Sequence, residues 1–228
     1  MTTTAEKAFS CVDPTTAHYA VALCGGEDPV LTGIRGRAAA AGLPDIHVSA
    51  VDGRHLTVLA LASGAIKAVE VGTLAGYSGV CLLRGMPQDG VLHTCELDPA
   101  HAAVARDTFA QAGYAQRAHI HVGQAADTLS RVAKEGPFDL MFIDADKQAY
   151  PAYLAWAAQH LKVGGMLLAD NVFLWGTVGR SNRLATSDTP RETVDAMRAF
   201  NAAAVDGPVF KGTLLPTGEG LALAVRVR

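Results

Sequence analysis

Two segments of this chain each join an apolar run to an acidic turn: Phe142-Ile-Asp-Ala-Asp-Lys147 and Leu168-Ala-Asp-Asn171. Apolar runs of this kind are typical of buried strands in a parallel α/β sheet. Because the carboxyl ends of parallel strands line one crevice, we expect Asp144, Asp170 and Asn171 to lie close together. Two carboxylates at about 4 Å repel by roughly 4 kcal/mol at an effective dielectric near 20. The pattern therefore predicts a site for a hard divalent cation, Mg²⁺ or else Ca²⁺ or Mn²⁺, because such ions prefer oxygen ligands.

A lysine lies close to the first acidic residue in the sequence. Lys147 lies three positions after Asp144, which places an amine beside the predicted cation. Such an amine can deprotonate a metal-bound hydroxyl if burial and the nearby charge lower its pKa. The alternative is that Lys147 only forms an ion pair with the acidic residues. Asp146 either supports Lys147 or caps the following helix.

The composition is that of one globular domain. The chain has 228 residues, of which 50% are hydrophobic and 18% are charged, and its net charge is −3. This balance provides no basic field for nucleic acid, and no apolar run approaches the ~20 residues of a membrane span. The first residues lack the apolar core of a signal peptide. The four cysteines show no spacing of a zinc or redox motif, so we expect reduced thiols and a cytoplasmic location, with no nucleic-acid or membrane partner.

Helical and strand patterns alternate along most of the chain, which predicts an α/β fold with a doubly wound parallel sheet. We expect helices at about 29–41, 50–63, 77–84, 99–112, 125–134 and 150–161. We expect strands at about 67–71, 91–96, 119–122, 138–143 and 165–169. The tail differs, because 209–215 and 221–227 flank a turn with Pro216 and Gly218 and read as an antiparallel hairpin. Such a hairpin is typical of the seven-stranded sheet that binds S-adenosylmethionine (SAM).

The turn after the first strand, Gly72-Thr-Leu-Ala-Gly76, lies where a dinucleotide fingerprint would lie. Leu74 occupies the position of the second glycine of that fingerprint, which the backbone needs in order to approach a pyrophosphate. SAM has no phosphate, so the turn favours SAM over NAD. Glu96 ends the next strand and can accept hydrogen bonds from both ribose hydroxyls.

These motifs resemble those of a known family. Val69-Glu-Val-Gly-Thr73 with Gly76-Tyr-Ser78, and the two acidic segments quoted above, are similar to the cation-dependent O-methyltransferases typified by the catechol and caffeoyl-CoA enzymes, especially small bacterial members. The likeness covers about residues 29–228. It implies one Rossmann-like SAM methyltransferase domain over 1–228, with a seven-stranded, mostly parallel sheet, a C-terminal antiparallel hairpin and helices on both faces. It also implies that 1–64 form a lid or dimer region, that 65–228 form the core, and that the protein is a homodimer.

The resemblance assigns roles to single positions. It implies metal ligation by Asp144, Asp170 and Asn171, and catalysis by Lys147 as the base together with Asp144. The SAM contacts that it implies are Val48, Glu70, Gly72, Thr73, Ser78, Glu96, Ala125 and Asp144. The chain departs from the family in two segments. Asp52-Gly53-Arg54 replaces a frequent Glu-Gly-Gln step, and Val172-Phe-Leu-Trp175 is one residue longer than usual.

The resemblance implies methyl transfer to a small substrate with two vicinal oxygens, and a catechol-like phenol is the first expectation. A hydroxyacyl group or a sugar diol would chelate a cation as well. Three other classes compete: a nucleotide-dependent oxidoreductase, a metal-independent methyltransferase, and a non-catalytic module that binds SAM or a cation. Tyr77 and Trp175 either line the pocket or belong to the core. Arg180, Arg183 and Arg191 either lie on a solvated loop or meet an acidic substrate.

Overall fold

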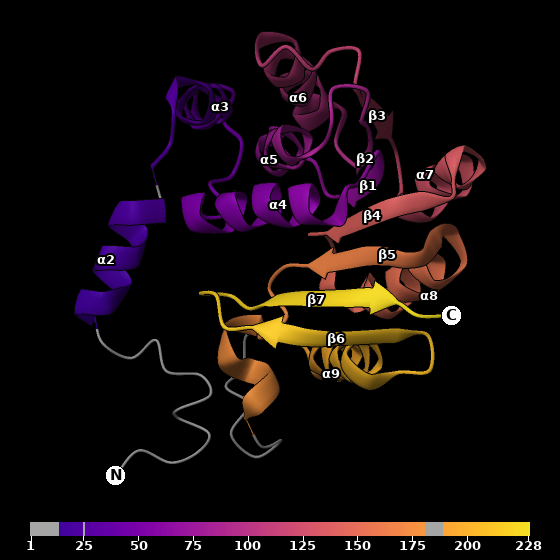
Figure 1. Cartoon of the computed structure of the whole chain (residues 1–228). Helices are drawn as coiled ribbons and strands as arrows, with labels where there is room; N and C mark the ends of the chain where they lie inside the picture. Colours follow the sequence, from indigo (N-terminus) through magenta and orange to yellow (C-terminus); the bar gives the residue numbers. More distant parts are fainter. Residues whose placement is uncertain (1–13, 25, 181–188) are drawn as a thin grey trace.

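The computed structural model describes residues 14–24, 26–180 and 189–228. These residues form a seven-stranded sheet with the order β3-β2-β1-β4-β5-β7-β6 (Figure 1). The strands from β1 to β5 pair in parallel, and β7 is antiparallel to both β5 and β6. The predicted fold class is confirmed. The strand bounds are Lys67–Val71 (β1), Val91–Glu96 (β2), Ala118–Val122 (β3), Phe138–Ile143 (β4), Leu161–Ala169 (β5), Phe210–Leu215 (β6) and Leu221–Arg226 (β7).

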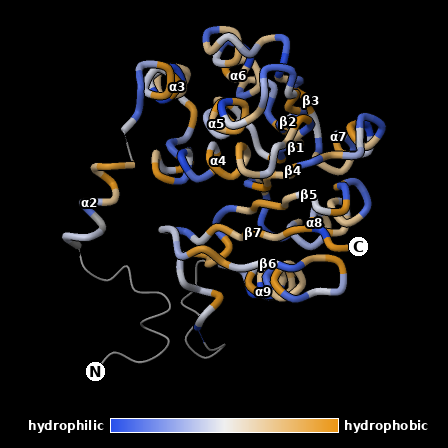
Figure 2. The backbone as a smooth tube through the Cα atoms, viewed as in Figure 1, coloured by the Kyte–Doolittle hydropathy of each residue, from blue (hydrophilic) through white to orange (hydrophobic). Residues whose placement is uncertain are grey.

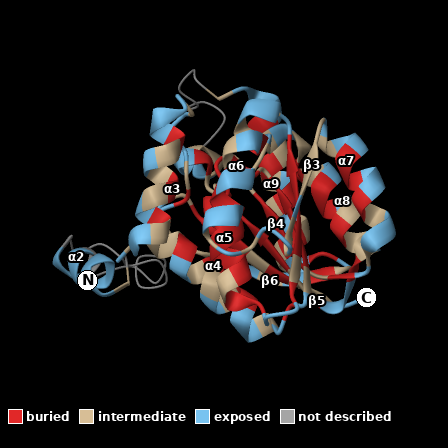
Figure 3. Cartoon of the chain, turned by 90° about the horizontal axis from the view of Figure 1, so that it is seen from above, coloured by how far each residue is buried: buried red, intermediate tan, exposed pale blue. Residues whose placement is uncertain are grey.

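Helices cover both faces of the sheet (Figure 3). On one side lie α3 (Pro29–Ala40), α4 (Ala50–Ser63), α5 (Tyr77–Gly85) and α6 (Pro99–Gln111). On the other lie α7 (Ala125–Val132), α8 (Tyr150–His160) and α9 (Arg191–Asp206). Short 3₁₀ turns occupy Ala133–Glu135, Lys147–Ala149 and Leu174–Gly179. A further helix, α2 (Pro14–Cys24), which the sequence pattern did not predict, lies away from the sheet (Figure 1). Within the described ranges, no helix is long and apolar enough to cross a membrane.

The helix ends follow from local sequence. Asp28 and Asp98 each precede a proline and accept hydrogen bonds from backbone N–H groups of the first turn, which would otherwise be unsatisfied. Ser49 caps α4 in the same way through the Asp52 amide. Gly64 ends α4 in the left-handed conformation expected of a C-terminal glycine. These caps fix the ends of α3, α4 and α6, and the α4 cap lies next to the site described below.

Two hydrophobic clusters hold the layers together, one on each face of the sheet. Phe138 and Phe200 belong to the cluster beneath α7, α8 and α9, and Leu56 and Phe109 belong to the cluster beneath α4, α5 and α6. Hydrophobic and hydrophilic residues alternate along the helices that surround the sheet (Figure 2). Each fully buried side chain of this size contributes about 1.5–3 kcal/mol. The sheet is therefore a rigid base for the loops at its strand ends.

The end of α8 differs from the prediction. The expected helix continued to Leu161, but α8 ends at His160 and Leu161 begins β5 by pairing with Phe138. The pairing register shifts before Leu140, and Gly164 has a positive φ of 85° there. This bulge accommodates the extra residues that the pattern assigned to a helix end and a turn. The strand therefore begins earlier than the predicted residue 165.

The C-terminal hairpin brings a distant turn to the end of β5. Because β7 inserts between β5 and β6, the β6–β7 turn reaches the segment after Asp170. The Val172 amide donates to the Gly220 carbonyl at 3.1 Å, and the Phe173 amide donates to the Glu219 carbonyl at 3.1 Å. Two segments far apart in sequence thus form one wall beside the acidic strand end.

Candidate active site

A cavity of about 1010 Å³ opens at the carboxyl ends of β1, β2 and β4. Its volume is at the upper end of the range for small-molecule sites, which is about 300–1,000 Å³. The structure brings most of the predicted site residues into this one cavity. Those that line it are Val48, Gly72, Thr73, Ser78, Glu96, Ala125, Asp144, Lys147 and Asn171. The segment 45–48 forms another part of the wall, although the sequence places it before the sheet.

Acidic groups gather where β4 and β5 stop: Asp144 lines the cavity, whereas buried Asp170 is not among the described residues that line it. Asp170 is 5% exposed, and its backbone neighbour Asn171 donates an amide hydrogen bond to Asp170 Oδ1 at 2.7 Å. Burial, followed by the negative charge of Asp144, raises the pKa of Asp170 to about 7. The two carboxylates therefore repel each other in a partly desolvated place, as the sequence predicted. A cation of charge +2 between them would relieve this repulsion.

The three residues predicted as ligands carry oxygen atoms of the kind that Mg²⁺, Mn²⁺ and Ca²⁺ bind. Asp144 and Asp170 have carboxylates, and Asn171 has an amide oxygen. Among the residues that the structure describes, no group of three or more His, Cys, Asp and Glu side chains is placed to hold a metal. The predicted set contains two such side chains and an amide. A site of this composition leaves coordination positions for water and substrate, as is usual for Mg²⁺.

Lys147 is held by two neighbours. Its Nζ donates to Asp144 Oδ1 at 2.8 Å and to Tyr150 Oη at 3.1 Å. Tyr150 is fully buried, and its hydroxyl donates in turn to the Asp170 carbonyl at 2.8 Å. Tyr150 was missed by the sequence reading, although its spacing of three residues from Lys147 gave a signal. Asp146 accepts a hydrogen bond from the Gln148 amide at 3.2 Å and so caps the short 3₁₀ turn Lys147–Ala149, not the following helix α8, whose N-cap is Ala149.

Glu96 fixes the glycine turn from the neighbouring strand. Its Oε2 accepts hydrogen bonds from the Thr73 amide at 3.1 Å and the Leu74 amide at 2.8 Å. Its Oε1 accepts from the Asp98 amide at 2.9 Å. Glu96 also lines the cavity, so the same carboxylate that orders the turn is within reach of a ligand.

Glu70 lies behind the cavity wall and is fully buried. Its carboxylate accepts hydrogen bonds from Ser78 Oγ at 2.6 Å and Thr94 Oγ1 at 2.7 Å. Burial raises the pKa of Glu70 to about 7. Unlike the other predicted SAM positions, Glu70 is not among the described residues that line the cavity. From this position Glu70 can orient the side chain of Ser78, which does line the cavity.

Gly72 sits where two loops meet. Its φ is +97°, and a Cβ added to it would lie 1.9 Å from the Asp144 carbonyl oxygen. Neither condition admits a side chain. The absence of a side chain at Gly72 thus sets the distance between the glycine turn and the acidic strand end.

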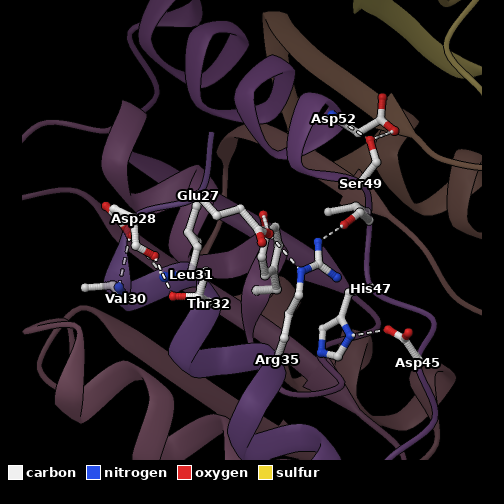
Figure 4. A network of polar contacts seen from close by, with 12 residues as sticks. Glu27, Asp28, Val30, Leu31, Thr32, Arg35, Asp45, His47, Ser49 and Asp52 are labelled. Carbon is white, nitrogen blue, oxygen red and sulfur yellow. Dashed lines mark hydrogen bonds and ion pairs between the residues drawn. The ribbon is translucent and has the colours of Figure 1, made fainter. Parts of the chain in front are cut away.

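A polar network holds the 45–48 segment over the cavity (Figure 4). Arg35 donates through Nη2 to the Val48 carbonyl at 3.0 Å and through Nε to Glu27 Oε1 at 2.7 Å. The Tyr77 hydroxyl donates to the same Glu27 oxygen at 2.5 Å, and the Arg35 guanidinium lies 4.5 Å above the Tyr77 ring. No spacing in the sequence indicated Glu27 or Arg35. Tyr77 does line the cavity, one of the two interpretations left open for it.

Trp175 and Glu219 border the cavity on the side of the acidic strand end, where the segment after Asp170 meets the β6–β7 turn. Trp175 is 60% exposed and lines the cavity, which favours its interpretation as part of the mouth over a core position. Glu219, another residue missed by the sequence reading, comes from the β6–β7 turn. Arg191 forms an exposed ion pair with Asp195 at 3.5 Å, as expected of a solvated position. Arg183 lies outside the described residues.

Comparisons with known proteins agree with the motifs. A family model described as O-methyltransferase matches residues 22–227. A catechol O-methyltransferase of Niastella koreensis is 37% identical over 224 residues, which cover 95% of this chain and 97% of the relative. A catechol O-methyltransferase of Mycobacterium tuberculosis is 41% identical over 203 residues, which cover 88% of this chain and 90% of the relative.

A solved structure extends the likeness to three dimensions. The O-methyltransferase from Bacillus cereus in complex with SAH superimposes with a TM-score of 0.82 and 32% identity, over 96% of this chain and 99% of that one. The family match spans the glycine turn, both acidic segments and the C-terminal hairpin. The family and the enzyme class expected from the motifs are therefore confirmed: the chain belongs to the O-methyltransferase family.

Proposed function

We propose that this enzyme transfers the methyl group of SAM to a hydroxyl of a small substrate with vicinal oxygens, with the help of a divalent cation. The observation that carries the proposal is the Lys147–Asp144 contact of 2.8 Å beside the buried Asp170, in the same cavity as the glycine turn. A structure of a Bacillus cereus relative in complex with SAH supports the choice of cofactor.

Each part of the cavity has a separate task. Glu96 binds the ribose hydroxyls of SAM, and the turn at Gly72 and Thr73 lies against its methionine chain. Asp144, Asp170 and Asn171 would hold the cation, which lowers the pKa of a hydroxyl that chelates it. Lys147 accepts the hydroxyl proton at Nζ, while its contacts with Asp144 and Tyr150 hold that atom in place. Fixing both reactants in one cavity removes much of the entropic barrier to the transfer.

A catechol-like phenol is the proposed acceptor. Two adjacent hydroxyls can approach one cation together, and the relatives from Niastella koreensis and Mycobacterium tuberculosis are named catechol O-methyltransferases. The half-exposed mouth at Trp175 gives an aromatic surface against which a flat ring can pack. A hydroxyacyl group or a sugar diol is the second candidate, because either one can also chelate.

The test is methyl transfer from SAM to a small panel of catechols, with Mg²⁺ and with excess EDTA. We expect EDTA to abolish transfer and added Mg²⁺ to restore it. Without a cation between Asp144 and Asp170, nothing would lower the pKa of the acceptor hydroxyl. Transfer that continues in EDTA would contradict the metal proposal and leave a metal-independent methyltransferase. If the protein binds SAM and methylates a hydroxyacyl compound or a sugar diol but no catechol, the second candidate is the acceptor.

We further propose that residues 1–64 contribute a homodimer contact through α2. Apart from half-buried Cys24, every α2 side chain that the structure describes is exposed, and Tyr19, Val21 and Leu23 are large and apolar. A helix of 11 residues is marginal in water without packing. A second copy of the chain would supply that packing.

Light scattering tests the dimer. We expect the dimer mass for the native chain, and the monomer mass with an unchanged circular dichroism spectrum for the double variant Val21→Asp/Leu23→Asp. A native chain with the monomer mass would contradict the proposal.

A cytoplasmic location is proposed on the state of the cysteines. Cys24, Cys81 and Cys95 are free thiols, and Cys81 and Cys95 are buried. Burial raises the pKa of the Cys81 thiol to about 12 and that of the Cys95 thiol to about 11. Thiols of this kind are inert and suit a reducing compartment.

A further inference from the structure

His47 is a buried polar side chain whose bonding is incomplete. It lines the cavity, and its side chain is only 3% exposed. Neither ring nitrogen has a hydrogen-bond partner among the described residues, and the nearest carboxylate oxygen, Asp45 Oδ1, is 3.6 Å from Nδ1. A buried nitrogen without a partner costs about 1–3 kcal/mol. A ligand bound in the cavity would explain this unpaired group, because it could supply the missing hydrogen-bond partner.

The surroundings of His47 select the chemistry of that ligand. Its ring meets the ring of Tyr77 edge-on, with ring centroids 6.0 Å apart. Tyr77 is the first residue of α5, and no described side chain caps this helix end. Uncapped N–H groups at a helix start, together with the helix dipole, favour an anionic group. Arg35 bonds the Val48 carbonyl next to His47, but its charge is paired with Glu27 at 2.7 Å, so the start of α5 is the feature that favours an anion.

We propose that His47 is a cofactor-binding residue that donates a hydrogen bond from its ring N–H to the carboxylate at the amino-acid end of SAM. The inference rests on the proposed function for its ligand, and it adds a contact that the motifs did not indicate. Burial and the charge of Arg35 lower the pKa of His47, so the free ring is neutral and carries one N–H. In this proposal the carboxylate would lie between this N–H and the start of α5; Val48 and Ser78, the chain neighbours of His47 and Tyr77, line the same cavity.

Isothermal titration of the cofactor without metal or acceptor tests the contact. Two probes differ in one group: SAM has the carboxylate, and decarboxylated SAM has only the amine. In His47→Phe, we expect the Kd of SAM to rise by about tenfold, the usual effect of a lost hydrogen bond to a charged group. The Kd of decarboxylated SAM should stay within about twofold, and His47→Gln, whose amide can donate from nearly the same place, should recover most of the SAM affinity.

Controls separate the contact from a general loss of structure. His119→Phe replaces an exposed histidine on β3 and should leave both Kd values unchanged. Thermal unfolding checks each variant, and His47→Leu replaces His47→Phe if the latter does not fold. Equal weakening of both probes, or no weakening of SAM, would overturn the role of His47. Failure of the native protein to bind SAM would instead overturn the proposed function.

Discussion

Lys147→Ala should lower kcat by about 100-fold and leave the Kd of SAM nearly unchanged, because general-base catalysis contributes about 10²–10⁴-fold. The amine touches Asp144 and Tyr150 at the end of the cavity where the acceptor would bind, and the glycine turn makes no hydrogen bond to it among the described contacts. Single-turnover methyl transfer with saturating SAM and Mg²⁺ measures the first effect. Titration with SAM measures the second.

Two further variants decide what Lys147 does. Lys147→Arg keeps the positive charge and the ion pair with Asp144, but its guanidinium cannot lose a proton at ordinary pH. It should therefore be as slow as Lys147→Ala. Full activity in Lys147→Arg would show that the residue only forms an ion pair. Lys162→Ala breaks a different ion pair, with Asp139 at 2.6 Å, and should retain activity.

Gly72→Ala should destabilise the fold by about 3 kcal/mol and prevent SAM binding. A residue other than glycine at a positive φ costs about 1–2 kcal/mol, and φ at Gly72 is +97°. The new methyl group would also lie 1.9 Å from the Asp144 carbonyl oxygen. Forcing a methyl group into closed packing typically adds about 1–3 kcal/mol. Either the glycine turn or the acidic turn must move, so both ends of the cavity lose their spacing.

Urea unfolding with Gly64→Ala as the matched variant separates the two causes. Gly64 has a φ of +62°, but no described atom lies within 4 Å of the place where its Cβ would be. We expect Gly64→Ala to lose only about 1 kcal/mol, the conformational part. The difference between the two variants then measures the contact with Asp144. Equal losses, with SAM binding retained in Gly72→Ala, would show that this contact is not restrictive.

The fold and the acidic corner could be predicted because local rules determine them. Apolar runs followed by Asp144 and Asp170 identify strand ends, and strand ends of a parallel sheet meet in space. The end of α8 was predicted wrongly because Leu161 suits a buried helix position and a buried strand position equally well. Only the pairing with Phe138 across a bulge decides between them.

The contacts that the sequence did not show are those between distant elements. Arg35 reaches Val48 across 13 positions, and Glu27 reaches Tyr77 across 50. No periodicity relates such positions, because the path of the chain between them sets their separation. His47 belongs to the same class, since a lone histidine before a helix carries no signal until its burial is known. Glu70 shows the opposite case, where a motif position lies behind the wall and acts through Ser78.

The junction between the β6–β7 turn and the end of β5 has a consequence for how such enzymes diversify. The antiparallel hairpin supplies Glu219, one side of the wall that Phe173 completes from the end of β5, whereas the glycine turn and Glu96 belong to the parallel half of the sheet. Substitutions and insertions in the hairpin turn can therefore reshape the acceptor end while the cofactor end keeps its geometry. The segments around Phe173 and Glu219 could therefore be replaced together by protein engineering while the rest of the molecule is kept.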